Sequence, residues 1–351
     1  MNNMVKRILL DIPRIGFVLM ALIGLLLYSN EAAAGVKAGT SLMLDVLIPS
    51  LFPFMVLSSY IVHSGVLDGV SKTLSPPFSF LFKLSGSALP AVVLGFIGGY
   101  PVGAMTTASL YNRQEITQNE AERLMFFSVN GGPAFLVTAI GAGMFQNKQL
   151  GIILYCSTIA SSFIIGICLR FLFESEKMRD GKYKRLSNEN AFTTAVSEAS
   201  KSIIGVFGWV LTFSCIGGLL DTTGITGYYS AVLKGILEIS TGSKACAGVV
   251  PIPVLAALLS FGGIAVICQI KPYLDECEVS IKKLLTIKAI TAALSAFICS
   301  NLLNIFKIGV HTVIQKVERP VFSAYSAYAG VLLLIMCALF VLDVETKRKK
   351  C

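Results

Sequence analysis

The chain has 351 residues, of which 54% are hydrophobic and 14% are charged, and its formal net charge is +9. Soluble domains carry about 25% charged residues, so this composition excludes a soluble multidomain enzyme and indicates a polytopic membrane protein. The basic residues fall in the breaks between apolar runs. That placement is typical of cytoplasmic loops that contact anionic lipids, and it argues against nucleic-acid binding.

Nine apolar segments are long enough to span a bilayer. In chain order they cover residues 8–28, 41–63, 88–111, 124–146, 149–172, 201–220, 247–270, 284–305 and 321–343. The first of them, followed by three alanines at 32–34, resembles a secretory signal with a cleavage site. Because another apolar run follows closely, we expect an uncleaved first helix.

The distribution of basic residues predicts a tenth membrane crossing. Both ends of the chain and the loop at 170–185 are basic, so the positive-inside rule places all three in the cytoplasm. Five spans before that loop would put it outside. Residues 64–87, which are half apolar and contain Pro76 and Pro77, supply the missing crossing. Whether 64–87 and 225–241 cross the membrane or re-enter it stays open at this point.

A weak internal sequence similarity, called the echo below, predicts that the two halves of the chain arose by duplication. The sequence GVLD at 65–68 recurs as GLLD at 218–221, and FIGG at 96–99 recurs as FGGI at 261–264. With ten crossings the two copies run in opposite directions. The expected fold is therefore an all-α transmembrane bundle of about ten spans, with two inverted repeats and broken or re-entrant helices, as in many secondary transporters.

These patterns divide the chain into five parts. They are an N-terminal transmembrane helix (1–40), a first repeat (41–172), a basic cytoplasmic linker (173–200), a second repeat (201–305), and a C-terminal helix with a basic tail (306–351).

Two glycine- and proline-rich breaks predict a solute path. GGYPVG at 98–103 and SVNGGP at 128–133 interrupt helical hydrogen bonding, which lipid tolerates only beside protein or water. Close helix packing is the competing explanation. The proposed path comprises Gly99, Tyr100, Pro101, Gly103, Ser128, Asn130 and Pro133, with Gln269 and Asn301 from the second copy.

Few residues suit catalysis or metal binding. The nine cysteines form no C-x-x-C pair, and there are two histidines. The sequence shows no P-loop, HExxH, dinucleotide fingerprint or Ser-His-Asp order. We therefore predict no enzyme activity, metal or cofactor. The acidic residues Asp45, Asp68 and Asp221 lie near span ends, where they either cap helices or couple transport to protons or sodium.

Several motifs closely resemble the YlbJ family of sporulation integral membrane proteins. They are SLFPF at 50–54, GYPVGA at 99–104, IT at 116–117 with EAERL at 120–124, SVN at 128–130 with Pro133, LEISTG at 237–242 and SFGG at 260–263. That family belongs to the nucleoside-recognition, or Gate, group, which includes parts of concentrative nucleoside transporters and the membrane portion of ferrous-iron transporters. The resemblance implies a multi-pass protein of a bacterial cell membrane, required for normal spore cortex formation.

The expected function is transport or gating of a small polar solute, such as a nucleoside-like molecule. The expected partners are membrane lipids and this solute, and self-association into a homo-oligomer stays open. The alternative is a non-transporting membrane scaffold for cortex-building enzymes. The first function makes Asn130 and Tyr100 essential, whereas the second makes the loop at 174–188 essential.

Overall fold

The computed structural model describes residues 15–16, 18–64, 67–173 and 188–307, and this part is helical with no strands. The predicted helix at 321–343, the basic tail, residues 174–187 of the linker at 173–200, and residues 8–14 and 17 of the span at 8–28 lie outside it. The all-α architecture is confirmed for the described residues.

Five helices of the described part are long and apolar enough to cross a membrane. They are Ser29–Ile61, Lys148–Leu172, Ala191–Thr223, Ile252–Glu276 and Ile281–Phe306. A bent pair, Thr73–Phe82 with Gly86–Gly98, meets the same test at an angle of 94°. Two predicted spans, 88–111 and 124–146, are not single helices, because each is interrupted at its glycine- and proline-rich break.

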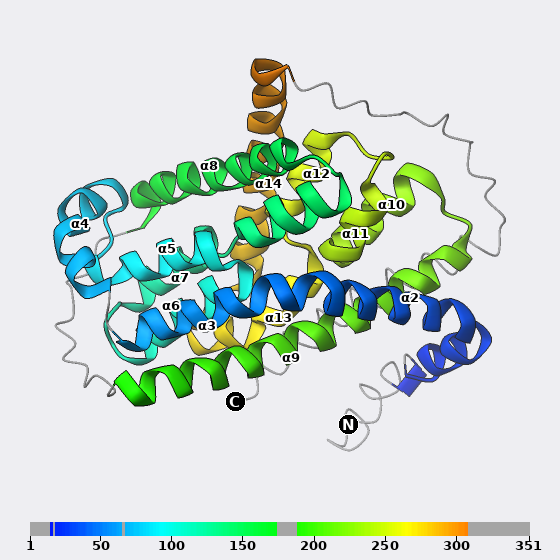
Figure 1. The fold of residues 1–351 in the computed structure, drawn as a ribbon, viewed down its shortest axis with the longest axis horizontal. Helices are drawn as coiled ribbons and strands as arrows, with labels where there is room; N and C mark the ends of the chain where they lie inside the picture. The colour runs from blue at the N-terminus through cyan, green and yellow to red at the C-terminus, as the bar shows by residue number, and fades with distance from the viewer. Residues whose placement is uncertain (1–14, 17, 65–66, 174–187, 308–351) are drawn as a thin grey trace, which may run out of the picture.

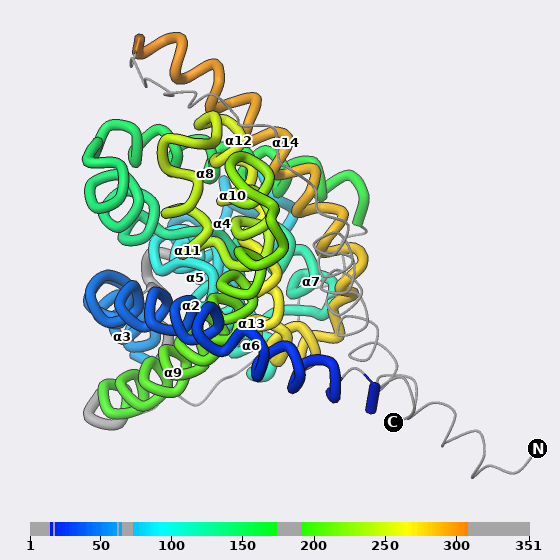
Figure 2. The backbone as a smooth tube through the Cα atoms, turned by 90° about the vertical axis from the view of Figure 1, so that its right-hand side faces the viewer, coloured from blue at the N-terminus to red at the C-terminus, as the bar shows by residue number. Residues whose placement is uncertain are grey.

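Two long helices lie side by side along the molecule. The first is continuous through α2 (Ser29–Leu42), the π-helical η1 (Met43–Leu47) and α3 (Ile48–Ser64), and it packs along α9 (Asn188–Leu220) (Figures 1 and 2). A Cβ on Gly35 would lie 2.2 Å from the carbonyl oxygen of Ser214. Glycine at this position therefore permits backbone-to-backbone packing.

A partly buried polar network joins α3 to α9 and to the end of α6. His63 lies 3.0 Å from the Glu198 carboxylate through Nε2, and the Arg113 guanidinium lies 2.7 Å from its Nδ1. Ser59 donates to the same carboxylate at 2.5 Å. The network fixes the end of α3 against two helices that are distant in sequence.

Each half of the chain contains a helical hairpin. In the first half, α4 (Leu67–Phe82) and the 3-10 turn η2 (Gly86–Ala88) lead into α5 (Leu89–Gly98), which turns back at Gly99 into α6 (Tyr100–Asn112). In the second, the turn η4 (Asp221–Thr223) precedes α10 (Gly227–Leu237), which turns back at Glu238 into α11 (Ile239–Cys246).

Glycine pairs bring the two arms of each hairpin together. A Cβ on Gly103 would lie 3.0 Å from the Cα of Gly95, and a Cβ on Gly242 would lie 2.4 Å from the Cα of Gly235. Because side chains would separate the arms, both hairpins depend on these small residues.

Each hairpin is followed by a broken helix and then by a long helix. In the first half these are α7 (Gln118–Phe127), η3 (Ala134–Met144) and α8 (Lys148–Leu172). In the second they are α12 (Ile252–Phe261), α13 (Gly263–Glu276) and α14 (Ile281–Phe306). The two halves thus share one order of elements.

This order differs from the repeat expected from sequence. FIGG at 96–99 ends at a hairpin tip, whereas FGGI at 261–264 lies within the broken helix α12–α13. The echo therefore pairs unlike elements, because Gly-rich membrane segments resemble one another whatever bend they form. Of the other echo, residues 65–66 lie outside the described part.

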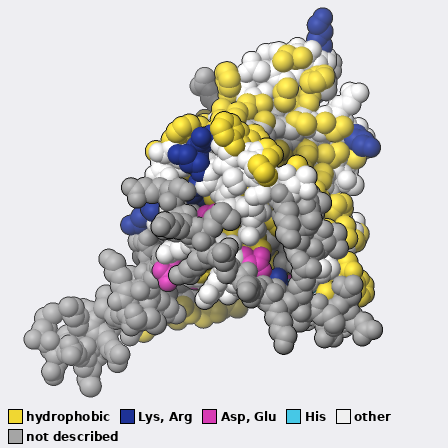
Figure 3. Space-filling model, turned by 90° about the vertical axis from the view of Figure 1, so that its left-hand side faces the viewer, with side chains coloured by type: hydrophobic (Ala, Val, Ile, Leu, Met, Phe, Trp, Pro, Cys, Tyr) yellow, Lys and Arg dark blue, Asp and Glu magenta, His cyan; other side chains and the backbone are white. Residues whose placement is uncertain are grey.

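Large apolar side chains are exposed on the outside of the bundle. Phe80, Phe171 and Leu172 are each about three-quarters exposed, and Figure 3 shows hydrophobic atoms over much of the visible described surface. Such a surface suits contact with lipid rather than with water.

Candidate functional site

The first hairpin packs against the break between α7 and η3. A Cβ on Gly95 would lie 2.2 Å from the Ser128 carbonyl oxygen, and one on Gly132 would lie 2.6 Å from the carbonyl oxygen of Ile97. Gly99 itself has φ +94°, which glycine adopts without strain. The glycines of hairpin and break therefore let two irregular backbone segments meet.

The second hairpin packs on its own broken helix in the same way. Gly263, with φ +80°, would place a Cβ 3.3 Å from the carbonyl oxygens of Gly235 and Ile236. Gly235 in turn approaches the side chain of Leu258. In both halves a hairpin tip therefore lies against a helix break.

Tyr100 joins the two halves at this point. Its hydroxyl donates to the carbonyl oxygen of Leu259, and its ring lies beside Gly262, where α12 ends. The side chain is buried. The sequence suggested that this hydroxyl holds a solute, but its proton is engaged by the backbone, so only the ring and the oxygen lone pair remain available.

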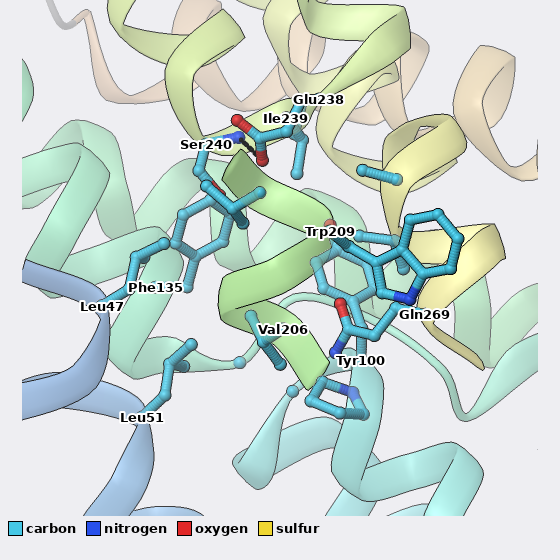
Figure 4. A pocket seen from close by; sticks show the side chains of 16 residues that line it. Leu47, Leu51, Tyr100, Phe135, Val206, Trp209, Glu238, Ile239, Ser240 and Gln269 are labelled. Carbon is cyan, nitrogen blue, oxygen red and sulfur yellow. Dashed lines mark hydrogen bonds between the residues drawn. The ribbon is translucent and has the colours of Figure 1, made fainter. Parts of the chain in front are cut away.

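A cavity of about 40 Å³ lies between the two hairpin tips (Figure 4). Its walls include Gly99, Tyr100, Pro101 and Gly132 from the first half, Glu238, Ser240 and Gln269 from the second, and Leu47, Leu51, Val206 and Trp209 from the long helices. Most of the wall is apolar, so its few polar groups determine what it can bind.

Glu238 provides an acidic group at the second tip. Its carboxylate accepts hydrogen bonds from the backbone N–H of Ser240 at 2.7 Å and of Thr241 at 2.6 Å, and from the Thr241 hydroxyl at 2.7 Å. It therefore caps α11, whose N-terminal dipole favours a negative charge. Although the side chain is buried, it borders the cavity.

Gln269 provides an unused donor. Within the described part of the chain, its Nε2 atom is buried and has no hydrogen-bond acceptor. Figure 4 shows the amide directed toward Tyr100. A buried amide donor without a partner costs about 1–3 kcal/mol, so a group that accepts from it would stabilise this wall.

The structure brings together four of the nine residues predicted from sequence. Gly99, Tyr100, Pro101 and Gln269 line the cavity. The other five lie elsewhere. Gly103 packs on Ser128, and the buried Ser128 hydroxyl donates to the carbonyl oxygen of Leu124. Pro133 is the residue immediately before the π-helical η3. Asn301 is exposed on α14, where its amide donates to Phe297 O.

Asn130 is buried behind the cavity and holds the break in shape. Its Nδ2 donates to the Phe127 carbonyl at 2.6 Å, and its Oδ1 accepts from the Ser162 hydroxyl at 2.8 Å. In this structure the Asn130 amide thus forms hydrogen bonds within the break and to α8.

Sequence reasoning missed Glu238, Trp209 and Gly132 as cavity residues. Glu238 carried a usable signal, because a lone carboxylate within the apolar stretch 225–241 is costly in a membrane and marks a functional position. Across the described ranges no three His, Cys, Asp or Glu side chains gather as metal ligands would.

Comparisons with known proteins show what the chain is similar to. Residues 44–148 match the Gate family model, described as nucleoside recognition. The Gate match runs from η1 through the first hairpin and the break to the start of α8. The chain is also 26% identical over 290 residues, 70% of its length and 71% of the relative's, to the sporulation integral membrane protein YlbJ of Bacillus subtilis (strain 168).

No solved structure matches the chain. The resemblance predicted from sequence is confirmed by the Gate match and by the relative, and the chain is a multi-pass protein of the cell membrane.

Proposed function

We propose that this protein moves a small polar solute across the cell membrane through the cavity between its two hairpin tips. The observation that carries the proposal is the buried, unpartnered amide nitrogen of Gln269 in that cavity. Hairpins and broken helices that meet at a cavity are the elements from which secondary transporters build their solute sites.

The cavity polar groups favour a solute that both donates and accepts hydrogen bonds. Gln269 offers a donor, and the Glu238 carboxylate retains lone pairs for a hydroxyl or amine. The rings of Phe135 and Trp209 provide flat apolar surfaces in the same walls. A nucleoside-like molecule, with a ring and several hydroxyls, satisfies all three features, and the Gate description points to the same class.

Solute entry requires the hairpin tips to separate. A cavity of about 40 Å³ holds a few water molecules, whereas pockets for small molecules are about 300 Å³ or larger. The hydrogen bond between Tyr100 and Leu259 closes the cavity between the halves. We propose that it breaks when the solute enters.

The proposal includes the finer topology. The shared order of hairpin, broken helix and long helix supports two repeats. Ten crossings would place the three basic segments in the cytoplasm and give the two repeats opposite directions. The similarity to the sporulation integral membrane protein of Bacillus subtilis supports a role in sporulation. We propose that the solute serves spore cortex formation.

Uptake of radiolabelled uridine and adenosine by proteoliposomes tests the function. We expect saturable uptake, which Gln269→Leu reduces at least about tenfold without lowering the thermal unfolding midpoint, because the lost amide nitrogen has no partner. Asn301→Leu is the matched control, an amide exchanged outside the cavity, and it should retain uptake.

Two results would overturn the proposal. One is the absence of saturable uptake for both nucleosides, and the other is equal uptake by Gln269→Leu and the original protein. If sporulation then tolerated Asn130→Ala and Tyr100→Phe but required residues 174–188, the scaffold alternative would replace it.

A further inference from the structure

A lysine of the second half reaches the break of the first. Lys288 lies two turns into α14, is 3% exposed, and donates from Nζ to the carbonyl oxygen of Val129. The same nitrogen lies 3.4 Å from Asn130 Oδ1. An amine therefore occupies the place where the backbone between α7 and η3 leaves helical geometry.

The contacts of this amine are unusual for a buried charge. An ammonium has three N–H donors, and the structure gives Lys288 two oxygen partners, both neutral. Burying an ammonium without a carboxylate costs several kcal/mol. Such a residue inside a membrane bundle marks a functional site.

Among the described residues, the helices with the main contacts to α14 supply no free counter-charge to Lys288. The helices packed on α14 are α7, α8 and α12, and α12 contains no ionisable side chain. On α7, the Glu120 carboxylate caps its own helix, and the Glu122 carboxylate lies 3.0 Å from the Lys283 ammonium. The Arg123 guanidinium donates to the carbonyl oxygens of Phe82 and Lys83. On α8, Lys148 is exposed, Arg170 lies 3.4 Å from Leu81 O, and Tyr155 donates to Phe96 O.

The corresponding contact at the break between α12 and α13 is made by neutral groups. Thr158 of α8 lies 3.3 Å from the hydroxyl of Ser260, two residues before the second break. α8 and α14 thus each contact the broken helix of the opposite half. At the first break the contacting group is the Lys288 amine of α14, and at the second it is the Thr158 hydroxyl of α8. Of these two contacts, the one at the first break is the one made by a titratable group.

The position of the Lys288 amine connects it to the cavity. Carbonyls freed where a membrane helix unwinds are the groups that hold coupling cations in secondary transporters. Here the carbonyl of Val129 holds an ammonium of the chain itself, and Gly132, three residues later, lines the cavity against the first hairpin tip.

We propose that the Lys288 amine is a proton-binding site that couples proton movement to opening of the cavity. With the proton bound, the ammonium holds the Val129 carbonyl and keeps the break closed on the first hairpin. When one N–H bond breaks, the electron pair stays on nitrogen and the proton passes to water. The neutral amine keeps two N–H donors but loses the charge that strengthens its hydrogen bond to Val129, so the break opens more readily. The coupling to solute rests on the proposed function, whereas the proton site itself does not.

Hydrogen–deuterium exchange of the full chain in lipid nanodiscs tests the site. Exchange of peptides covering residues 124–136 is compared at about pH 6 and about pH 9, with labelling times scaled for intrinsic exchange. We expect these peptides to exchange at least about threefold faster at the higher pH, while peptides from α9 do not change.

Variants assign the effect to one amine. In Lys288→Gln, whose side chain is never charged, peptides covering residues 124–136 should exchange fast at both pH values. In Lys288→Arg, whose side chain stays charged, the same peptides should exchange slowly at both pH values. Lys283→Gln is the matched control, because that lysine is exposed and pairs with Glu122, and it should keep the pH dependence.

The measurement on the unaltered chain decides the case even where a variant fails to fold. Equal scaled exchange of residues 124–136 at both pH values would overturn the proton site, as would unchanged pH dependence in Lys288→Gln. Uridine uptake is read separately, so loss of the proton site and loss of transport are distinguishable.

Discussion

The phenol of Tyr100 donates a hydrogen bond to the carbonyl of Leu259, a residue 159 positions later in the chain. This bond joins the tip of the first hairpin to the broken helix of the second half. It makes the cavity a feature of the assembled chain and not of either half.

Removing this hydroxyl should destabilise the protein. Tyr100→Phe leaves the Leu259 carbonyl buried without its donor, which costs about 1–3 kcal/mol. We expect a lower free energy of unfolding and faster amide exchange at residues 258–263. Tyr229→Phe, at an exposed tyrosine, is the control and should change neither. Equal stability of the two variants would show that the bond contributes nothing.

The glycines between hairpin and break should not tolerate a methyl group. Gly95→Ala places a Cβ 2.2 Å from the Ser128 carbonyl oxygen, so hairpin and break must separate and the yield of monodisperse protein should fall. Gly205→Ala in α9 meets no atom within 4 Å and should stabilise its helix by about 0.5–1 kcal/mol. Opposite shifts of the two melting temperatures check the prediction, and parallel shifts contradict it.

Arg123 should be required for docking α4. It is 2% exposed, and its guanidinium donates to the carbonyls of Phe82 and Lys83 at the end of α4. Arg123→Met leaves both acceptors unpaired, at a cost of about 1–3 kcal/mol each. Limited proteolysis should then cut residues 73–86 faster. Arg123→Lys should lie between, since an ammonium replaces a two-pronged donor; full protection in the Met variant would refute this role.

Cys277 should be inert in the folded protein. Burial, together with the nearby charge of Glu276, raises the pKa of its thiol to about 12. The reactive thiolate is therefore scarce at neutral pH, and a raised pKa shifts its formation toward strongly basic solution. After treatment with N-ethylmaleimide, mass spectrometry should find Cys277 unmodified in the native protein and modified in the unfolded control. Rapid native labelling would contradict the burial.

Local chemistry made the helix interruptions predictable. Pro101 and Pro133, each close to glycines, marked where helices are interrupted. The sequence pattern of Thr117 followed by Glu120 is that of a capping box, and the structure shows this capping box at the start of α7. These signals depend on neighbours in sequence, so they survive without knowledge of the fold.

Contacts between distant segments were not predictable in the same way. Gly99 forms a hairpin tip and not a kink because Gly95, Gly103 and the Ser128 carbonyl meet in space. Asn301 was expected in the path, but the side of α14 that carries it faces outward. Lys288 resembled the basic residues at the start of α14 until its amine was placed at Val129.

The crossed contacts of α8 and α14 make the halves interdependent. A chain cut between residues 172 and 188 would give two fragments, each lacking the contact that reaches its interrupted segment from the other half. Neither fragment should adopt its final shape alone, yet the two together retain every contact between Thr158 and Ser260 and between Lys288 and Val129. Complementation by separately encoded fragments is therefore built into the way this bundle is assembled.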